Sequence, residues 1–136
     1  KDYLSAKLYY DLGSFDLMRN NYQACIVTAQ NALKDYPYTK LREELSILIL
    51  RAKYKMAYKS VEEKQVDRYR DTIDEYYAFK NEFPESKYIE EAEEYYRKKC
   101  DEIISVREWT KSCLEEIGFS VLDSKANFLL YSYIVW

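Results

Sequence analysis

An internal repeat is the feature that most constrains the fold, because the chain matches itself when it is displaced by 47 residues. The displacement places Tyr22 on Tyr69 and Pro37 on Pro84. The further matched pairs are Ile26 with Ile73, Tyr36 with Phe83, Thr39 with Ser86, Lys40 with Lys87, and Glu43-Glu44 with Glu90-Glu91. Repeats of about 20 to 50 residues are typical of stacked units, each of which buries its apolar face against a neighbour. The chain is therefore expected to be an array of such units.

Each repeated unit is predicted to be a pair of helices. Apolar residues recur every three or four positions, the period of one helix face, over residues 3–18, 22–36, 39–58, 69–82 and 86–104. The first run contains Leu4, Leu8, Leu12, Phe15 and Met18, and the third is expected to bury Leu41, Leu45, Leu48, Ala52 and Met56. Residues 59–68 are highly charged and are expected to form a solvated extension or loop. Only two glycines and two prolines are present, which argues against sandwich or doubly wound folds. The expected fold class is all-α.

The last thirty residues lack the repeat. Ser105 and Glu108 have the spacing of a capping box, so a sixth helix is expected to begin there and to stop at Gly118. The residues that follow are β-branched and aromatic around Asp123-Ser124-Lys125, which indicates one or two short strands; a helix over 126–136 is the alternative. We therefore expect a repeat domain at 1–104 and a less regular C-terminal segment at 105–136.

Composition argues against most catalytic and metal-site classes. The chain has no histidine, which is the commonest general base and zinc ligand. The Glu-Glu pairs point about 100° apart on a helix and so do not converge on one substrate atom. The net charge of −3 is dispersed, so nucleic acid is not expected as a partner. The three cysteines, Cys25, Cys100 and Cys113, are expected to be small buried residues. No catalytic residue, metal or cofactor is predicted.

One stretch of the repeat resembles a known family. Tyr9, Leu12, Gly13, Tyr22, Cys25, Ala32 and Pro37 have the spacing of a tetratricopeptide repeat, and Tyr69 and Pro84 mark the next unit. The small residues Gly13 and Cys25 stand where two helices of one hairpin approach closely, and aromatic residues fill the space beside them. The resemblance implies a helical-hairpin solenoid that acts as a protein-interaction scaffold.

Within this superfamily, the linkers KDYPYTKLREE and NEFPESKYIEEAEEYY are similar to those of BamD-type lipoproteins, over about residues 6–104. Such proteins belong to the machinery that assembles outer-membrane β-barrels. The resemblance implies a location at the periplasmic face of the outer membrane, with a lipid anchor outside these residues, and binding to the periplasmic domains of the barrel-forming subunit. Another tetratricopeptide adaptor or peptide-binding protein, periplasmic or cytoplasmic, is the alternative.

The resemblance also indicates a partner-binding surface. Lys7, Tyr10, Ser14 and Leu17 correspond to residues that line the concave face of such solenoids, and Arg42 is expected to be exposed beside them. In contrast, the tyrosines at repeat positions, Tyr9, Tyr22, Tyr69, Tyr76 and Tyr88, are expected to pack between helices.

The tail carries a second resemblance. The run REWTKSCLEEIGFSVLDSKANFLL is similar to part of the small domain of histidinol-phosphate aminotransferases, which are pyridoxal-phosphate enzymes. A fragment of such an enzyme, or a fusion with one, is therefore the alternative function of a different class. The apolar residues between Phe128 and Trp136 are expected to pack on the last repeat helices or to mediate self-association.

Overall fold

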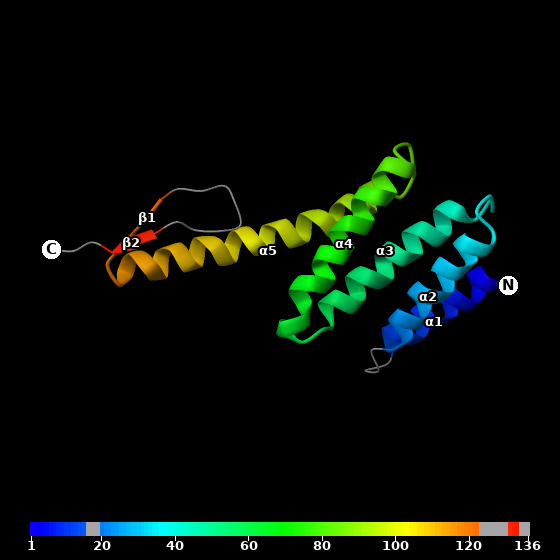
Figure 1. Cartoon of the computed structure of the whole chain (residues 1–136), viewed down its shortest axis with the longest axis horizontal. Coiled ribbons are helices and arrows are strands. Elements are labelled where there is room, and N and C mark those ends of the chain that lie inside the picture. The colour runs from blue at the N-terminus through cyan, green and yellow to red at the C-terminus, as the bar shows by residue number, and fades with distance from the viewer. Residues whose placement is uncertain (16–19, 123–130, 134–136) are drawn as a thin grey trace. The chain divides into compact units, whose positions relative to one another are not determined.

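A computed structural model describes residues 1–15, 20–122 and 131–133, and it is mostly helical, as expected for an all-α protein (Figure 1). The helices are α1 (Asp2–Phe15), α2 (Asn20–Asp35), α3 (Arg42–Tyr58), α4 (Glu62–Glu82) and α5 (Ile89–Glu116). Two short strands follow, β1 (Phe119–Val121) and β2 (Tyr131–Tyr133). The chain divides into two compact units, Lys1–Tyr96 and Arg97–Trp136. This division falls inside α5, as does the boundary expected between residues 104 and 105.

The internal repeat is a repeat of structure. The Thr39 hydroxyl accepts a hydrogen bond from the amide of Leu41 (3.3 Å), and 47 residues later the Ser86 hydroxyl accepts one from the amide of Tyr88 (3.0 Å). A short Ser or Thr side chain bonds readily to the amide two residues ahead, which stabilises the turn before a helix. Both α3 and α5 begin directly after such a turn.

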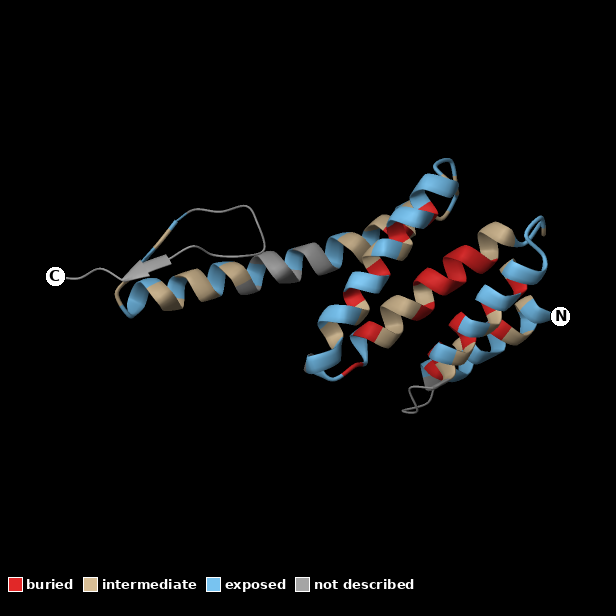
Figure 2. Cartoon of the chain, viewed as in Figure 1, coloured by how far each residue is buried: buried red, intermediate tan, exposed pale blue. Residues whose placement is uncertain are grey.

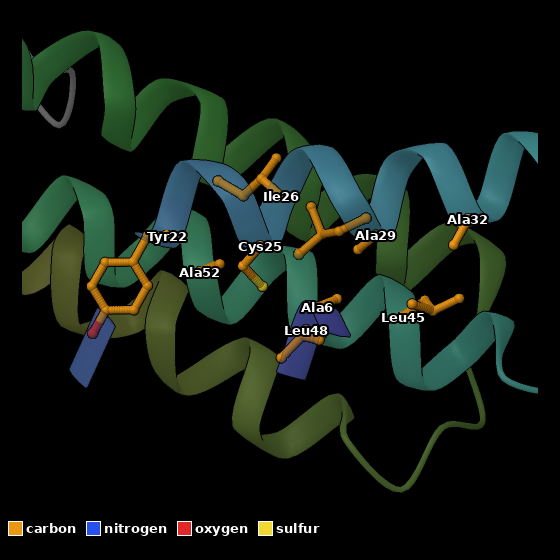
Figure 3. Packing of buried hydrophobic residues seen from close by; sticks show 10 residues of the cluster. Ala6, Tyr22, Cys25, Ile26, Ala29, Ala32, Leu45, Leu48 and Ala52 are labelled. Carbon is orange, nitrogen blue, oxygen red and sulfur yellow. The ribbon is translucent and has the colours of Figure 1, made fainter. Parts of the chain in front are cut away.

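The first core forms where α2 packs on both α1 and α3 (Figure 3). Its buried residues are Ala6, Tyr22, Cys25, Ile26, Ala29, Ala32, Leu45, Leu48, Ile49 and Ala52. The small residues Cys25, Ala29 and Ala32 of α2 are all buried, and small residues at a helix crossing allow close interaxial approach.

A second core lies on another side of α3. It joins Ile47 and Leu50 of α3 to Tyr76 and Phe79 of α4 and to Ala92 at the start of α5. Residues 45–50 are consequently all buried, and Figure 2 shows burial along much of α3. A helix that is buried all round is typical of a central element rather than a surface element.

The structure corrects the stripe expected for α3. Leu41 is exposed and precedes the helix, whereas Ile47 and Leu50 are buried outside the expected set. The expectation assumed one apolar face, but α3 packs against α2 on one side and α4 on the other.

The apolar face of α1 lies largely in solvent. Leu4, Leu8 and Leu12 are 67%, 58% and 45% exposed, while Ala6 is fully buried. Tyr9 is also exposed, so the expectation that it packs between helices is wrong. The reason is that α1 turns its small residues, not its leucines, toward α2.

The charged interval at 59–68 is mostly helical, because α4 begins at Glu62. Ser60 is buried, its carbonyl accepts from the Gln65 side chain (3.0 Å), and its hydroxyl accepts from Arg68. The interval therefore forms the first turns of α4, and most of its described side chains are exposed, which agrees with the expected solvated extension and not with a loop.

The sixth helix expected from Ser105 is not separate, because α5 is continuous from Ile89 to Glu116. No glycine or proline occurs between residues 87 and 117, so nothing in that stretch interrupts the helix and the Ser105–Glu108 spacing does not cap one. Gly118 has a φ of 93°, which confirms the expected left-handed stop.

The expected strands are present as an antiparallel pair, with Phe119 opposite Tyr133 and Val121 opposite Tyr131. The helical alternative for 126–136 is therefore wrong at Tyr131–Tyr133. The predicted turn at Asp123-Ser124-Lys125 and the apolar residues Phe128, Leu129 and Leu130 lie outside the described residues.

Candidate functional site

A charged pair joins the middle of α3 to the start of α5. The guanidinium of Arg51 donates two hydrogen bonds to the carboxylate of Glu91, each 2.6 Å long. The two groups are half-buried. The hydrogen bonds from Arg51 lower the pKa of Glu91, and the same bonds raise the pKa of Arg51. Two parallel bonds of this kind fix direction as well as distance.

Three tyrosines surround this pair. The Tyr95 hydroxyl donates to Glu91 (2.7 Å), and its ring centroid lies 4.6 Å from that of Tyr54. The Arg51 guanidinium lies 5.3 Å from the centroid of the Tyr88 ring, within the range of a cation–π contact. Burial raises the pKa of Tyr95 above its ordinary value, and the hydrogen bond to the carboxylate of Glu91 is the second largest cause of this increase.

Tyr10 of α1 lies near enough to this pair for the charges of Arg51 and Glu91 to act on its hydroxyl. Its ring is half-buried and stands edge-on to Tyr22 at 5.7 Å. Burial is the largest cause that raises the pKa of Tyr10, and the charges of Arg51 and Glu91 also act on it. We call the set Tyr10, Arg51, Tyr54, Tyr88, Glu91 and Tyr95 the tyrosine–arginine cluster.

The cluster brings together α1, α3 and the start of α5, which are the first helices of successive repeats. Its tyrosine rings are each partly exposed. The charges of Arg51 and Glu91 neutralise each other, so the cluster carries no net charge and presents aromatic rings and hydroxyl groups. Tyrosine is enriched in protein-binding surfaces because its rigid ring buries much area at small entropic cost.

Acidic and cysteine side chains are the described groups that bear on metal binding and thiol chemistry. Among the described residues, no group of three or more acidic or cysteine side chains is placed to hold a metal ion. Cys25 is buried, and burial raises the pKa of its thiol to about 12, which keeps it protonated near neutral pH. Cys113 is half-buried, and the side chain of Cys100 lies outside the described residues.

The sequence-predicted binding residues are only partly brought together. Tyr10 belongs to the cluster, whereas Lys7 and Ser14 are exposed on α1. The Ser14 hydroxyl donates to the carbonyl of Tyr10 (3.3 Å). Leu17 lies outside the described residues.

Arg42 lies elsewhere. It begins α3, nine residues and roughly 13 Å along the helix axis from Arg51. Its guanidinium donates to Glu82 at the end of α4 and to the carbonyl of Pro37 (2.9 Å). These contacts tie the turn between α2 and α3 to α4, so Arg42 has structural partners of its own.

Sequence reasoning missed Arg51 and Glu91. They are 40 residues apart, so no local spacing connects them. The available signal is that Arg51 directly follows the apolar run LSILIL, where a charged side chain needs a partner.

No helix among the described residues is both long and apolar enough to cross a membrane. No protein-family model matches the chain, and no solved structure matches it.

Curated proteins share only a short stretch with the chain. It is 45% identical over 40 residues to a histidinol-phosphate aminotransferase of Brachyspira hyodysenteriae, covering 29% of this chain and 11% of the enzyme. The corresponding enzyme of Clostridium botulinum (strain Okra) is 42% identical over 41 residues, covering 30% of this chain and 12% of the enzyme. The chain thus spans about a tenth of the length of the curated relatives it matches.

Proposed function

We propose that the first unit is a non-catalytic scaffold of the tetratricopeptide type that binds a polypeptide partner through the tyrosine–arginine cluster. The observation that carries this proposal is the gathering of four partly exposed tyrosines from three successive first helices around an ion pair that is already satisfied. Such a surface supplies rigid aromatic contacts, and the two charges at its centre already have each other as hydrogen-bonded partners.

The sharper form of the proposal is a BamD-like component of outer-membrane β-barrel assembly. It is supported by the resemblance of the two linkers and by the matching turns that they form at Thr39 and Ser86. The partner would then be the periplasmic domains of the barrel-forming subunit, and the location would be the periplasmic face of the outer membrane. Another adaptor of the same repeat class, periplasmic or cytoplasmic, has the same surface available.

The test is a binding titration with purified periplasmic domains of the barrel-forming subunit. The double variant Tyr10→Ala/Tyr88→Ala should weaken binding at least about fivefold, the threshold of a contributing contact. The matched control is Tyr36→Ala/Tyr38→Ala, which removes two exposed rings from the turn after α2. Circular dichroism checks that both variants keep the helical content of the parent.

Three results are informative. Weakening by the cluster variant alone supports the proposed surface. If the cluster variant and the control variant bind the periplasmic domains with equal affinity, the tyrosine–arginine cluster is not the binding surface. If the parent chain does not bind these domains, the BamD-like form of the proposal is rejected and an adaptor for another partner is favoured. Arg97 and Lys98 of the second unit are then the next residues to substitute.

The local matches favour one further candidate, a segment shared with aminotransferases. We propose that the similar run at 107–130 has no catalytic role here, because it brings no recognisable phosphate cradle or Schiff-base lysine. Addition of pyridoxal phosphate to the chain should therefore produce no absorbance band of a protein-bound aldimine. A saturable band would favour the enzyme fragment instead.

A further inference from the structure

The aromatic contacts of the two hairpins define which residues of α1 and α3 are equivalent. Tyr10 of α1 stands edge-on to Tyr22 with an interplanar angle of 66°, and Tyr54 of α3 stands edge-on to Tyr69 at 6.2 Å and 64°. Tyr22 and Tyr69 are already equivalent by the repeat, so Tyr10 corresponds to Tyr54. The first helices therefore align with a displacement of 44 residues. The longer start of α4 more than accounts for the other three residues, because Tyr69 follows the first residue of that helix by seven positions and Tyr22 follows that of α2 by two.

This alignment places the exposed leucines of α1 on a covered stripe of α3. The pairs are Leu4 with Leu48, Leu8 with Ala52, and Leu12 with Met56. In α3, the first two of these positions are buried in the first core and the third packs against it, beneath α2. The same face of α1 is open, with its leucines 67%, 58% and 45% exposed.

We propose that Leu4, Leu8 and Leu12 bind an amphipathic helix of a partner polypeptide, which lies on α1 as α2 lies on α3. The binding helix carries small residues among its buried positions, as α2 does with Cys25, Ala29 and Ala32 in the core that it shares with α1 and α3. Small residues are required all the more because Leu8 is bulkier than Ala52, its equivalent. The proposal is independent of the tyrosine–arginine cluster, which none of these three leucines joins.

A second copy of the chain does not offer the same contact. The small-residue face of α2 is buried in the first core of its own molecule, so it is not free to cover α1 of another. The occupant is therefore a different helix with that pattern.

The test uses the intact chain and a fluorescent peptide with the sequence of α2, residues 20–35. Isolated helices of this length are marginal in water, so the peptide carries Gln30→Glu joined to Lys34 by a lactam, both being exposed positions of α2. Cys25→Ala prevents oxidation and keeps that position small. Fluorescence anisotropy follows binding, and sedimentation measures the mass of the chain alone.

The expected result is saturable binding that Leu8→Lys weakens at least about tenfold, since a buried leucine is replaced by a charge. The matched control is Val66→Lys on α4, because Val66 is 65% exposed and should leave the affinity unchanged. A peptide with Ala29→Lys should also bind at least about tenfold more weakly, because its contact face is no longer small.

Two outcomes overturn the proposal. One is the absence of saturable binding, or binding that Leu8→Lys and Val66→Lys weaken equally. The other is a dimer of the chain alone that Leu8→Lys dissociates, which would show that a second copy covers the face.

Discussion

Replacing Gly13 by alanine adds one carbon atom at a close contact between α1 and α2. A Cβ at Gly13 would lie 2.9 to 3.0 Å from three ring atoms of Tyr22. That ring cannot withdraw freely, because Tyr22 is buried, Tyr10 packs edge-on to it, and the Lys59 ammonium lies 5.3 Å from its centroid. The Lys59 ammonium also donates to the carbonyl of Gly13 (3.0 Å), which holds the two sides together.

Two opposing effects set the size of the change. Alanine is favoured over glycine inside a helix by about 1 kcal/mol. Overpacking a well-filled site costs about 1–3 kcal/mol. We therefore expect Gly13→Ala to lower the free energy of unfolding by about 1 kcal/mol, and Gly13→Val to lower it by about 1–3 kcal/mol, because valine adds two methyl groups and has a poorer helix propensity.

Urea unfolding followed by circular dichroism measures these values. The decisive comparison repeats Gly13→Ala in a Tyr22→Leu background, where the ring is gone and only the propensity gain of about 1 kcal/mol should remain. The sign of the effect should therefore reverse between the two backgrounds. Stabilisation by Gly13→Ala in the parent chain would refute the close contact and the helix register that depends on it.

Three further predictions concern titration, thiol reactivity and the tail. Arg51 lowers the pKa of Glu91 in the folded state, so their contact stabilises the fold above the ordinary carboxyl pKa of 4.5 and loses that effect as the pH falls below it. Melting temperatures measured as a function of pH should therefore fall less steeply in acid for Glu91→Gln than for the parent chain. In a Cys100→Ala background, Cys25 should react with a thiol reagent at pH 8 only upon unfolding, whereas half-buried Cys113 should react faster, as modification rates followed by mass spectrometry would show. Truncation after Ile104 should reduce solubility or heat stability, or alter the mass in solution, and a shortened chain identical to the parent in all three would refute a covering or self-associating tail.

The repeat made the turns predictable, since Thr39 and Ser86 recur with the same hydrogen bonds. The sequence did not predict correctly which face of α1 meets the core. Leucines at Leu4 and Leu8 suggest burial by their hydrophobicity, but Ala6 is the buried residue because close packing against α2 requires a small side chain. Periodicity shows that a face exists and does not show which neighbour is near enough to cover it.

The candidate site illustrates a different limit. Tyr10 was predicted as a candidate binding residue because the resemblance to tetratricopeptide repeats indicates which side of a first helix faces the concave surface. Arg51 and Glu91 pair across 40 residues, and their contact depends on how α5 packs beside α3. Continuity of α5 through Ser105 was likewise hidden, because a capping pattern acts only where the preceding backbone is not already helical.

The central position of α3 bears on how this chain could be divided into complementing fragments. A cut in the exposed turn at 36–41 would separate α1 and α2 from the rest of the chain. It would leave Ile26 and Ala29 uncovered on one piece, and Leu45, Leu48 and Ile49 on the other. Each piece would then present the surface that the other lacks, while the second core stays within the larger piece. Reassembly of the two pieces would be driven mainly by the packing of α2 on α3, with the smaller contact between α1 and α3 added to it.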